Sequence, residues 1–292
     1  MNKPSRPVLR YHGGKWKLAR WIIEHLPKHR VYVEPFGGAA SVLMLKPRSY
    51  AEVYNDLDGE IVNLFRVLRD PVSAEELERL LRLTPFARVE FNEAYEPSDS
   101  PVEQARRTVV KGYMGFGSAA VTQKSATLPG AGFKATTGFR SNSNRSGTTP
   151  AHDWANFPDK LCAFTERLRG VIIENREASI LMETHDGPET LFYLDPPYVH
   201  STRGLRQHRI PQSYRFEMSD DDHLDLLKAC KQIKGMVVIS GYPCDIYCDT
   251  LTGWRLVTKD AHADGARDRI ECLWINPAAQ DRMQRSMFGA TP

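Results

Sequence analysis

Hydrophobic residues in the first seventy positions alternate between helical spacing and short continuous runs. The spacing of Leu18, Trp21, Ile22 and Leu26 predicts an amphipathic helix over residues 17–26. After it, two apolar runs typical of buried strands are each followed by helical spacing, giving strands over 31–34 and 51–54 and helices over 39–45 and 61–68. This order predicts a parallel sheet with helices on both faces.

The second half of the chain repeats the alternation. Its predicted elements are strands over 171–174, 191–194 and 236–240, a helix over 223–230, and a closing antiparallel pair over 254–257 and 271–275. We therefore expect an α/β core formed by residues 1–70 and 158–277. Residues 71–157 are predicted to be a mostly helical insertion. Residues 278–292 show no periodic pattern, and we expect a loose tail there.

The composition is that of an ordinary soluble globular protein, with 41% hydrophobic and 26% charged residues in a chain of 292. A net charge of +3 is too small to indicate a nucleic-acid partner by itself. Because the N-terminus is polar and no run of about 18 apolar residues occurs, we expect neither a signal peptide nor a membrane span. The five scattered cysteines match no disulfide framework or zinc motif, which predicts a cytoplasmic protein.

Positive charge is concentrated in one stretch. Residues 104–152 contain no Asp or Glu, and aromatic residues are interleaved with their cations. The cations that we predict to contact a nucleic-acid backbone are Arg106, Arg107, Lys111, Lys124, Lys134, Arg140 and Arg145. The alternative is a polar insertion without a partner. A second acid-free segment, 200–215, carries Arg203, Arg206 and Arg209 and is either an active-site flap or a surface loop.

A glycine turn follows the first predicted strand. That strand ends in Glu34 and continues into Pro35, Phe36, Gly37 and Gly38, where the glycines let backbone amides approach a ligand closely. The turn has neither the G-x-G-x-x-G spacing nor the lysine of a phosphate-binding loop. With an acid at the strand end, a cationic or hydroxyl-bearing ligand is favoured over a polyphosphate.

The second predicted strand ends at Asn55 and Asp56. An acid at this place can accept hydrogen bonds from a ribose diol, as in other nucleotide sites at the carboxyl edge of a sheet. Asp56 or Asp58 could equally cap the helix that follows. The residues alone leave both interpretations open.

The sharpest motif is Asp195, Pro196, Pro197 and Tyr198, at the end of the strand over 191–194. Two prolines fix the backbone and remove two donors, so the Asp carboxylate and a Pro carbonyl form a rigid pair of acceptors for an amino group. Tyr198 adds a flat face on which a heterocycle can stack. Acceptors of this kind suit the exocyclic amine of adenine, a poor nucleophile that needs in-line positioning more than a strong base. In a duplex the base must first be flipped out.

These motifs together resemble the Dam-like, D12 class family of N6-adenine-specific DNA methyltransferases, in the group whose cofactor motif precedes the target-recognition region and the DPPY motif. The matching segments, in the family's order, are Arg10–Lys15, Glu34–Val42, Asn55–Asp56, Asn175–Glu177, Asp195–Tyr198, Ser219–His223 and Arg269–Asn276. Two departures stand out. Ala40 replaces a common glycine, which requires an ordinary backbone conformation there. Residues 104–152 do not match the family's recognition segment, which leaves the target sequence open and allows relaxed specificity.

The resemblance implies a Rossmann-like S-adenosylmethionine-dependent methyltransferase sheet with a mostly helical target-recognition insertion at 71–157. It implies that Asp195 and the Pro196 carbonyl hold the adenine amine while Tyr198 stacks on the flipped base. The implied cofactor residues are Tyr11, Gly14, Lys15, Glu34, Pro35, Phe36, Gly37, Gly38, Asn55, Asp56 and Asp195, with Glu177 near the cofactor's adenine. S-adenosylhomocysteine would be the product, double-stranded DNA the partner, and no metal would be required. We expect a monomer or weak dimer in a bacterial or phage-infected cell.

Three alternatives remain. The same chemistry could act on cytosine or on a protein glutamine, although those enzymes commonly open the motif with Ser or Asn instead of Asp195. A catalytically dead DNA-binding relative is opposed by the intact set of Lys15, Asp56 and Asp195. A nicotinamide-dependent oxidoreductase is opposed by the glycine spacing. Restriction–modification, phage genome protection and chromosome regulation would all use the same reaction.

Overall fold

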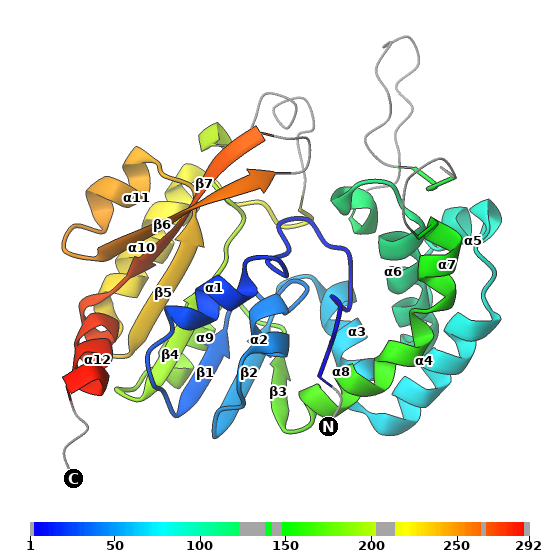
Figure 1. The fold of residues 1–292 in the computed structure, drawn as a ribbon, viewed down its shortest axis with the longest axis horizontal. Coiled ribbons are helices and arrows are strands. Elements are labelled where there is room, and N and C mark those ends of the chain that lie inside the picture. Colours follow the sequence, from blue (N-terminus) through cyan, green and yellow to red (C-terminus); the bar gives the residue numbers. More distant parts are fainter. Residues whose placement is uncertain (1–2, 123–137, 142–147, 203–213, 264–266, 289–292) are drawn as a thin grey trace.

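A seven-stranded mixed sheet forms the centre of the computed structural model, which describes residues 3–122, 138–141, 148–202, 214–263 and 267–288 (Figure 1). The strand order is β3-β2-β1-β4-β5-β7-β6. The strands are β1 (Val31–Glu34), β2 (Ala51–Asn55), β3 (Val171–Glu174), β4 (Thr190–Leu194), β5 (Met236–Gly241), β6 (Arg255–Ala263) and β7 (Arg267–Ile275). β1 to β5 are parallel, and β7 runs antiparallel to both β5 and β6. The predicted strands and the closing antiparallel pair are thereby confirmed.

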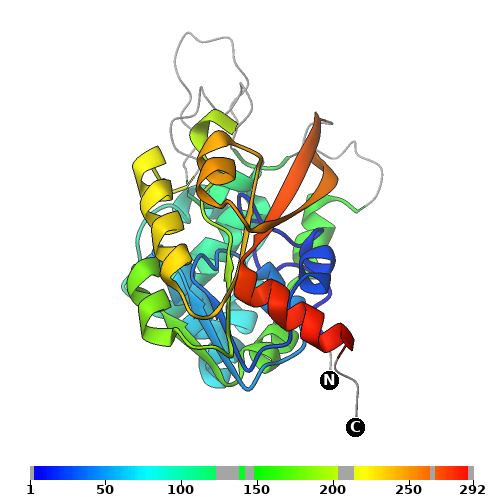
Figure 2. The ribbon, with the colours of Figure 1, turned by 90° about the vertical axis from the view of Figure 1, so that its left-hand side faces the viewer.

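Helices cover both faces of the sheet (Figure 2). Side chains alternate along each strand, so Tyr32 of β1 joins one hydrophobic cluster and Val33 joins the other. The first cluster lies under α1 (Ala19–Glu24), α2 (Ser41–Leu45) and α3 (Gly59–Arg69), and the second under α9 (Ala178–His185), α10 (Asp220–Gln232) and α11 (Asp245–Thr250). Nearly continuous apolar strands are the expected signature of a sheet buried on both sides.

Capping side chains set the helix starts that matter for the site. Asp58 begins α3 by accepting a hydrogen bond from the Glu60 amide at 3.0 Å. Asp70 separates α3 from the next helix, and Pro71 at the first turn of that helix fits its start because it needs no amide partner. Ser219 and Asp222 form a reciprocal capping box at the start of α10.

Between β2 and β3 the chain is mainly helical. It forms α4 (Pro71–Leu83), α5 (Arg88–Glu93), α6 (Pro101–Met114), the short η1 (Ser118–Val121), α7 (Pro150–Ala155), η2 (Pro158–Lys160) and α8 (Leu161–Leu168). We call α4 to α7 the helical block. Its core residues, among them Val109 and Trp154, belong to the same hydrophobic cluster as Tyr32 of the sheet, so the block shares a core with the sheet. Its division from the rest as a target-recognition unit stays a prediction.

The expectation of a loose C-terminal tail was wrong for the described residues. α12 (Pro277–Phe288) begins directly after β7 and packs along β5. Asn276 anchors it, because its side-chain oxygen accepts from the amides of Val237 and Ala279, both at 2.9 Å. Ala279 is fully buried. The helix has so few buried apolar positions that its sequence shows no clear period, and tertiary anchoring holds it in place.

Two features are absent from the described ranges. No helix there is long and apolar enough to cross a lipid bilayer. No group of three or more His, Cys, Asp and Glu side chains in that part of the chain is placed to hold a metal ion. The short η3 (His200–Thr202) follows β4 and leads toward the site described next.

Candidate active site

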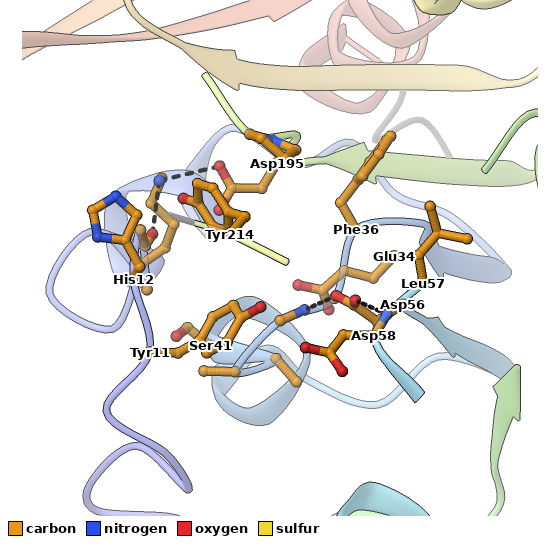
Figure 3. A pocket seen from close by; sticks show the side chains of 18 of the residues that line it. Tyr11, His12, Glu34, Phe36, Ser41, Asp56, Leu57, Asp58, Asp195 and Tyr214 are labelled. Carbon is orange, nitrogen blue, oxygen red and sulfur yellow. Dashed lines mark hydrogen bonds and ion pairs between the residues drawn. The ribbon is translucent and has the colours of Figure 1, made fainter. Parts of the chain in front are cut away.

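A pocket lies at the carboxyl ends of β1, β2 and β4 (Figure 3). The chain order reverses between β1 and β4, since β2 and β3 extend the sheet on one side and β5 on the other. Such a switch point is the usual ligand site in an open parallel sheet. The described wall consists of residues 11–15, Glu34, residues 36–42 and 56–58, Tyr193, Asp195, Pro197 and residues 214–218.

The first wall is a tight turn before α1. The Gly14 amide donates to the Tyr11 carbonyl at 3.2 Å, and Gly13 has φ +72°. The positive φ favours glycine at position 13, and a Cβ atom there would lie 2.2 Å from the Tyr214 hydroxyl and displace that side chain. The turn places Tyr11 and Lys15 on the pocket wall, and their predicted contact with a cofactor stays a prediction.

The second wall is the glycine turn after β1. A Cβ atom on Gly37 would lie 2.1 Å from the ring of Tyr54, and Gly38 has φ +46°. The Gly38 amide donates to Asp56 Oδ2 at 2.8 Å, and the Tyr54 hydroxyl donates to the Gly38 carbonyl at 2.8 Å. These contacts lock the turn of β1 onto the end of β2.

Ala40 contradicts the expectation of an ordinary backbone. Its φ of 51° and ψ of 37° lie in the left-handed region, and its side chain is fully buried. The Ala40 amide donates to the Gly37 carbonyl at 2.7 Å, which fixes this conformation at the start of α2. A left-handed alanine costs roughly 1–2 kcal/mol relative to its preferred conformations. The turn therefore holds an alanine in a conformation that glycine would adopt without this cost.

The two acids after β2 divide the roles that the sequence left open. Asp58 caps α3, whereas Asp56 accepts from the amides of Gly38 and Asp58, both at 2.8 Å. Burial raises the pKa of Asp56 to about 6. Both acids line the pocket, and Figure 3 shows them side by side at its floor.

Glu34 is buried at the end of β1, with 2% of its surface exposed. Burial, and secondarily the charge of Asp195, raise its pKa to about 8. Its Oε2 has no hydrogen-bond partner within the described structure. A buried carboxyl oxygen without a partner is costly, and such groups concentrate at functional sites.

Three predicted cofactor residues do not line the pocket. Asn55 is fully buried and uses its side chain to join neighbouring loops, donating to the carbonyls of Pro35 and Arg176 at 2.8 and 2.9 Å. The carbonyl of Pro35 therefore accepts a hydrogen bond from Asn55, and the residue does not face the pocket. Glu177 is exposed just before α9. For these residues the structure supports a role outside the pocket wall.

The predicted catalytic motif meets the N-terminal turn at the end of β4. Lys15 Nζ lies 3.1 Å from Asp195 Oδ1, which also accepts from Ser240 Oγ at 2.7 Å. Burial opposes the charge of Lys15, but Asp195 and Glu271 outweigh it and hold its pKa above the ordinary value. The same ammonium lies 4.5 Å from the ring centre of Tyr198. Ser240 and Glu271 are site residues that sequence reasoning did not assign.

A further wall comes from residues 214–218, which we call the strap. Tyr214 packs edge-on against Tyr11 and His12, with ring centres 6.2 and 5.0 Å apart. Arg215 forms ion pairs with Asp58 at 2.7 Å and Glu60 at 2.8 Å. The sequence placed a candidate flap at 200–215, and its described end at Tyr214 and Arg215 does lie over the pocket. Residues 203–213 lie outside the described residues.

The first predicted DNA-contacting cations are engaged within the helical block. Arg106 forms ion pairs with Glu90 at 2.8 Å and Glu103 at 2.7 Å, and Arg107 pairs with Glu103 at 2.8 Å. Only 13% of the Arg106 side chain is exposed. Assigning Arg106 to a phosphate was wrong, and Arg107 is largely neutralised. Glu90 and Glu103 precede the acid-free stretch 104–152 in the sequence. The composition of that stretch therefore gave no sign of these ion pairs.

Lys111 was also wrongly assigned to DNA. It is buried and pairs with Glu60, which also accepts from Thr108 Oγ1 at 2.7 Å. Arg140 donates to the Tyr113 carbonyl at 3.2 Å. The remaining predicted contacts lie outside the described residues and stay predictions: Lys124, Lys134, Arg145, Arg203, Arg206 and Arg209.

The chain is similar in sequence to known proteins over the segments that form the pocket. Residues 11–249 match the model of the D12 class N6 adenine-specific DNA methyltransferase family. Proteins named DNA adenine methylase are similar over shorter segments: 31% identity over 108 residues in Escherichia coli K12, 36% over 67 residues in Vibrio cholerae O395, and 34% over 67 residues in Serratia marcescens. These segments cover 35%, 23% and 23% of this chain and 38%, 24% and 24% of the respective relatives. Because the family match includes all three walls and the catalytic motif, the chain belongs to the D12 class N6 adenine-specific DNA methyltransferase family.

Proposed function

We propose that this protein transfers a methyl group from S-adenosylmethionine to the N6 amine of a flipped adenine in double-stranded DNA. The observation that carries the proposal is the shared pocket of Asp195, Glu34 and Asp56 in a chain of this family. The first acid suits an amine substrate, and the other two suit a cofactor that carries an ammonium group and a ribose diol.

The cofactor fits the residues present. Asp56 keeps acceptor capacity beyond its two amide bonds and would accept from the ribose hydroxyls. The unpartnered Oε2 of Glu34 is suited to a cationic amine, and Phe36 offers a flat face on the same wall. When bound, S-adenosylmethionine supplies an electrophilic methyl group on a sulfonium sulfur. S-adenosylhomocysteine would be the product.

The contacts of Asp195 indicate how it would hold the amine. Lys15 and Ser240 both contact its Oδ1, which fixes the carboxylate and leaves Oδ2 to accept an N–H of the adenine amine. The Pro196 carbonyl would accept the second N–H. With both hydrogens held, the nitrogen lone pair would face the methyl group. As the new N–C bond formed, the methyl–sulfur bond would break, and the surplus proton on the nitrogen would pass by way of Asp195 to solvent.

The DNA surface is part of the proposal. The helical block would contribute to target recognition, but its cations Arg106 and Lys111 serve packing. The phosphate contacts are assigned instead to the predicted cations beyond the described ranges, Lys124, Lys134, Arg145, Arg203, Arg206 and Arg209. The bacterial relatives favour the cytoplasm of a bacterial or phage-infected cell. Adenine is favoured over cytosine and protein glutamine because the matching family acts on adenine.

The test is transfer of labelled methyl from S-adenosylmethionine to unmethylated DNA, followed by nucleoside analysis of the product. We expect N6-methyl-2′-deoxyadenosine from the wild type and at least a hundredfold less from Asp195→Ala, because the amine loses its fixed acceptor. Asp225→Ala removes an exposed acid of α10 that pairs with Lys228, and it should retain full activity. Methylcytosine, or label on protein alone, would reassign the substrate. Cofactor binding without transfer to DNA would refute the proposal.

A further inference from the structure

Glu271 is a buried acid in β7 that does not belong to the described pocket wall. It belongs to the segment 269–276, which resembles a segment of the family and has no assigned role. Only 8% of its surface is exposed. Burial raises its pKa, while the nearby charge of Lys15 opposes that shift. A carboxyl group placed here needs a specific partner.

That partner is Tyr198 of the catalytic motif. The Tyr198 hydroxyl donates to Glu271 Oε2 at 3.1 Å. Burial and the charges of Asp195 and Glu271 hold the pKa of Tyr198 well above its ordinary value, so the phenol keeps its proton and remains a donor. Glu271 therefore fixes the outer end of the ring.

Two other contacts hold the ring by its face and edge. Lys15 Nζ lies 4.5 Å from the ring centre, and Tyr242 packs edge-on with ring centres 4.6 Å apart at 80°. Arg269 donates to the Tyr242 hydroxyl at 2.8 Å. Arg269 and Glu271 are two residues apart on β7 and therefore share a face of the strand. One strand thus supports Tyr198 both directly and through Tyr242.

We propose that Glu271 is a positioning residue that holds Tyr198 by its phenol, so that the ring presents a fixed face to the flipped adenine. The inference rests on the proposed function and adds a residue outside the catalytic motif. The bond to Glu271 constrains the ring more strictly than the face and edge contacts do, because cation–π and aromatic contacts are weakly directional compared with a charge-assisted hydrogen bond. A fixed ring holds the base so that its amine stays in line with the methyl group.

The test compares Glu271→Gln, Tyr198→Phe and the double variant. The matched control is Glu183→Gln, on the exposed side of α9. We expect Glu271→Gln to lower the single-turnover methyl-transfer rate roughly tenfold, as for a weakened hydrogen bond to a charged group. Cofactor affinity should stay unchanged, because Glu271 does not line the cofactor walls. In the Tyr198→Phe background, Glu271→Gln should have no further effect, since the phenol is already absent.

A spectroscopic readout separates positioning from a general loss of structure. Duplexes carrying 2-aminopurine in place of an adenine that the wild type methylates should fluoresce more strongly with Glu271→Gln than with the wild type, because the flipped base stacks less firmly. Unchanged fluorescence and rate in Glu271→Gln, or an undiminished effect in the Tyr198→Phe background, would overturn the inference while leaving the proposed function intact. A wild type that methylates no DNA would overturn the proposed function itself.

Discussion

Two buried glutamates on neighbouring strands have opposite surroundings. Glu52 lies near the start of β2 and Glu34 at the end of β1, with 3% and 2% of their surfaces exposed. Glu52 accepts from Lys46 at 2.6 Å and from both terminal nitrogens of Arg167, at 2.6 and 2.9 Å. These bonds overcome its burial and lower its pKa. The pKa of Glu34 is raised to about 8, and one of its oxygens has no partner.

The difference separates the two edges of the sheet. The amino-terminal edge satisfies its charge internally and therefore contributes stability. The carboxyl-terminal edge holds Glu34 and Asp56 with raised pKa values, which costs stability in the absence of a ligand. Two equally buried glutamates thus have different roles, since Glu52 stabilises the fold and Glu34 is available to a ligand.

The largest effect is expected at the amino-terminal edge. Glu52→Gln removes the charge that neutralises Lys46 and Arg167, both buried, and should lower the free energy of unfolding by about 4 kcal/mol. Because the pKa of Glu52 is lowered by folding, its contribution is complete above the unfolded pKa and disappears on acidification through the folded pKa. Urea unfolding at pH 7 measures the loss, with Glu166→Gln on the exposed side of α8 as control. A change no larger than the control's would contradict this account.

The identical substitution at the other edge should have the opposite sign. Glu34→Gln should raise the free energy of unfolding by up to about 4 kcal/mol at pH 8, since each unit by which folding raises the pKa is worth about 1.4 kcal/mol. The Glu34 carboxyl ionises near pH 4.5 in the unfolded chain and near pH 8 in the folded protein. The free energy of unfolding of the wild type should therefore decrease as the pH rises from 4.5 to 8. The difference between variant and wild type should vanish at pH 4. The same variant should bind S-adenosylmethionine more weakly. Destabilisation at pH 8 would show that Glu34 is a structural acid.

A smaller effect is expected from Asp56. With a pKa of about 6, its carboxylate protonates below that pH and loses acceptor capacity for the ribose hydroxyls. Cofactor affinity of the wild type should therefore decrease about tenfold per pH unit below pH 6. Asp56→Asn should bind about tenfold more weakly at pH 7.5 and lack the decrease that begins near pH 6, while any pH dependence due to Glu34, whose pKa is about 8, remains. Calorimetric titrations from pH 5 to pH 8 test both statements, with Asp225→Asn as control; an unchanged pH profile in Asp56→Asn would exclude the role.

The smallest effect concerns Ala40. Glycine at position 40 would relieve the left-handed alanine but lose a buried methyl group and gain unfolded-state entropy, so Ala40→Gly should change stability by less than about 1 kcal/mol. Ala39→Gly makes the same chemical change at a buried neighbour without positive φ and should destabilise by about 1 kcal/mol more. Equal losses in thermal unfolding would mean that the left-handed conformation of Ala40 is not strained.

Local patterns predicted the sheet and most of the pocket. The strands and the glycine turn could be predicted because their signals, the spacing of apolar residues and the presence of glycine, lie within a few neighbouring residues. Asp195 could be predicted because it directly follows a buried strand. Ion pairs such as Lys111 with Glu60 join residues 51 positions apart, which composition cannot reveal. The hydrogen bond from Tyr198 to Glu271 depends on the approach of β7 to β5, so the role of Glu271 had no local signal.

The position of the helical block has an evolutionary consequence. The block leaves the sheet after β2 and returns through α8 to β3, which is the outermost strand on that side. Insertions or deletions within it would shift no strand register among β1, β4 and β5, whose carboxyl ends carry Glu34, Asp195 and Ser240. The length of this segment can therefore vary during evolution while these residues keep their arrangement.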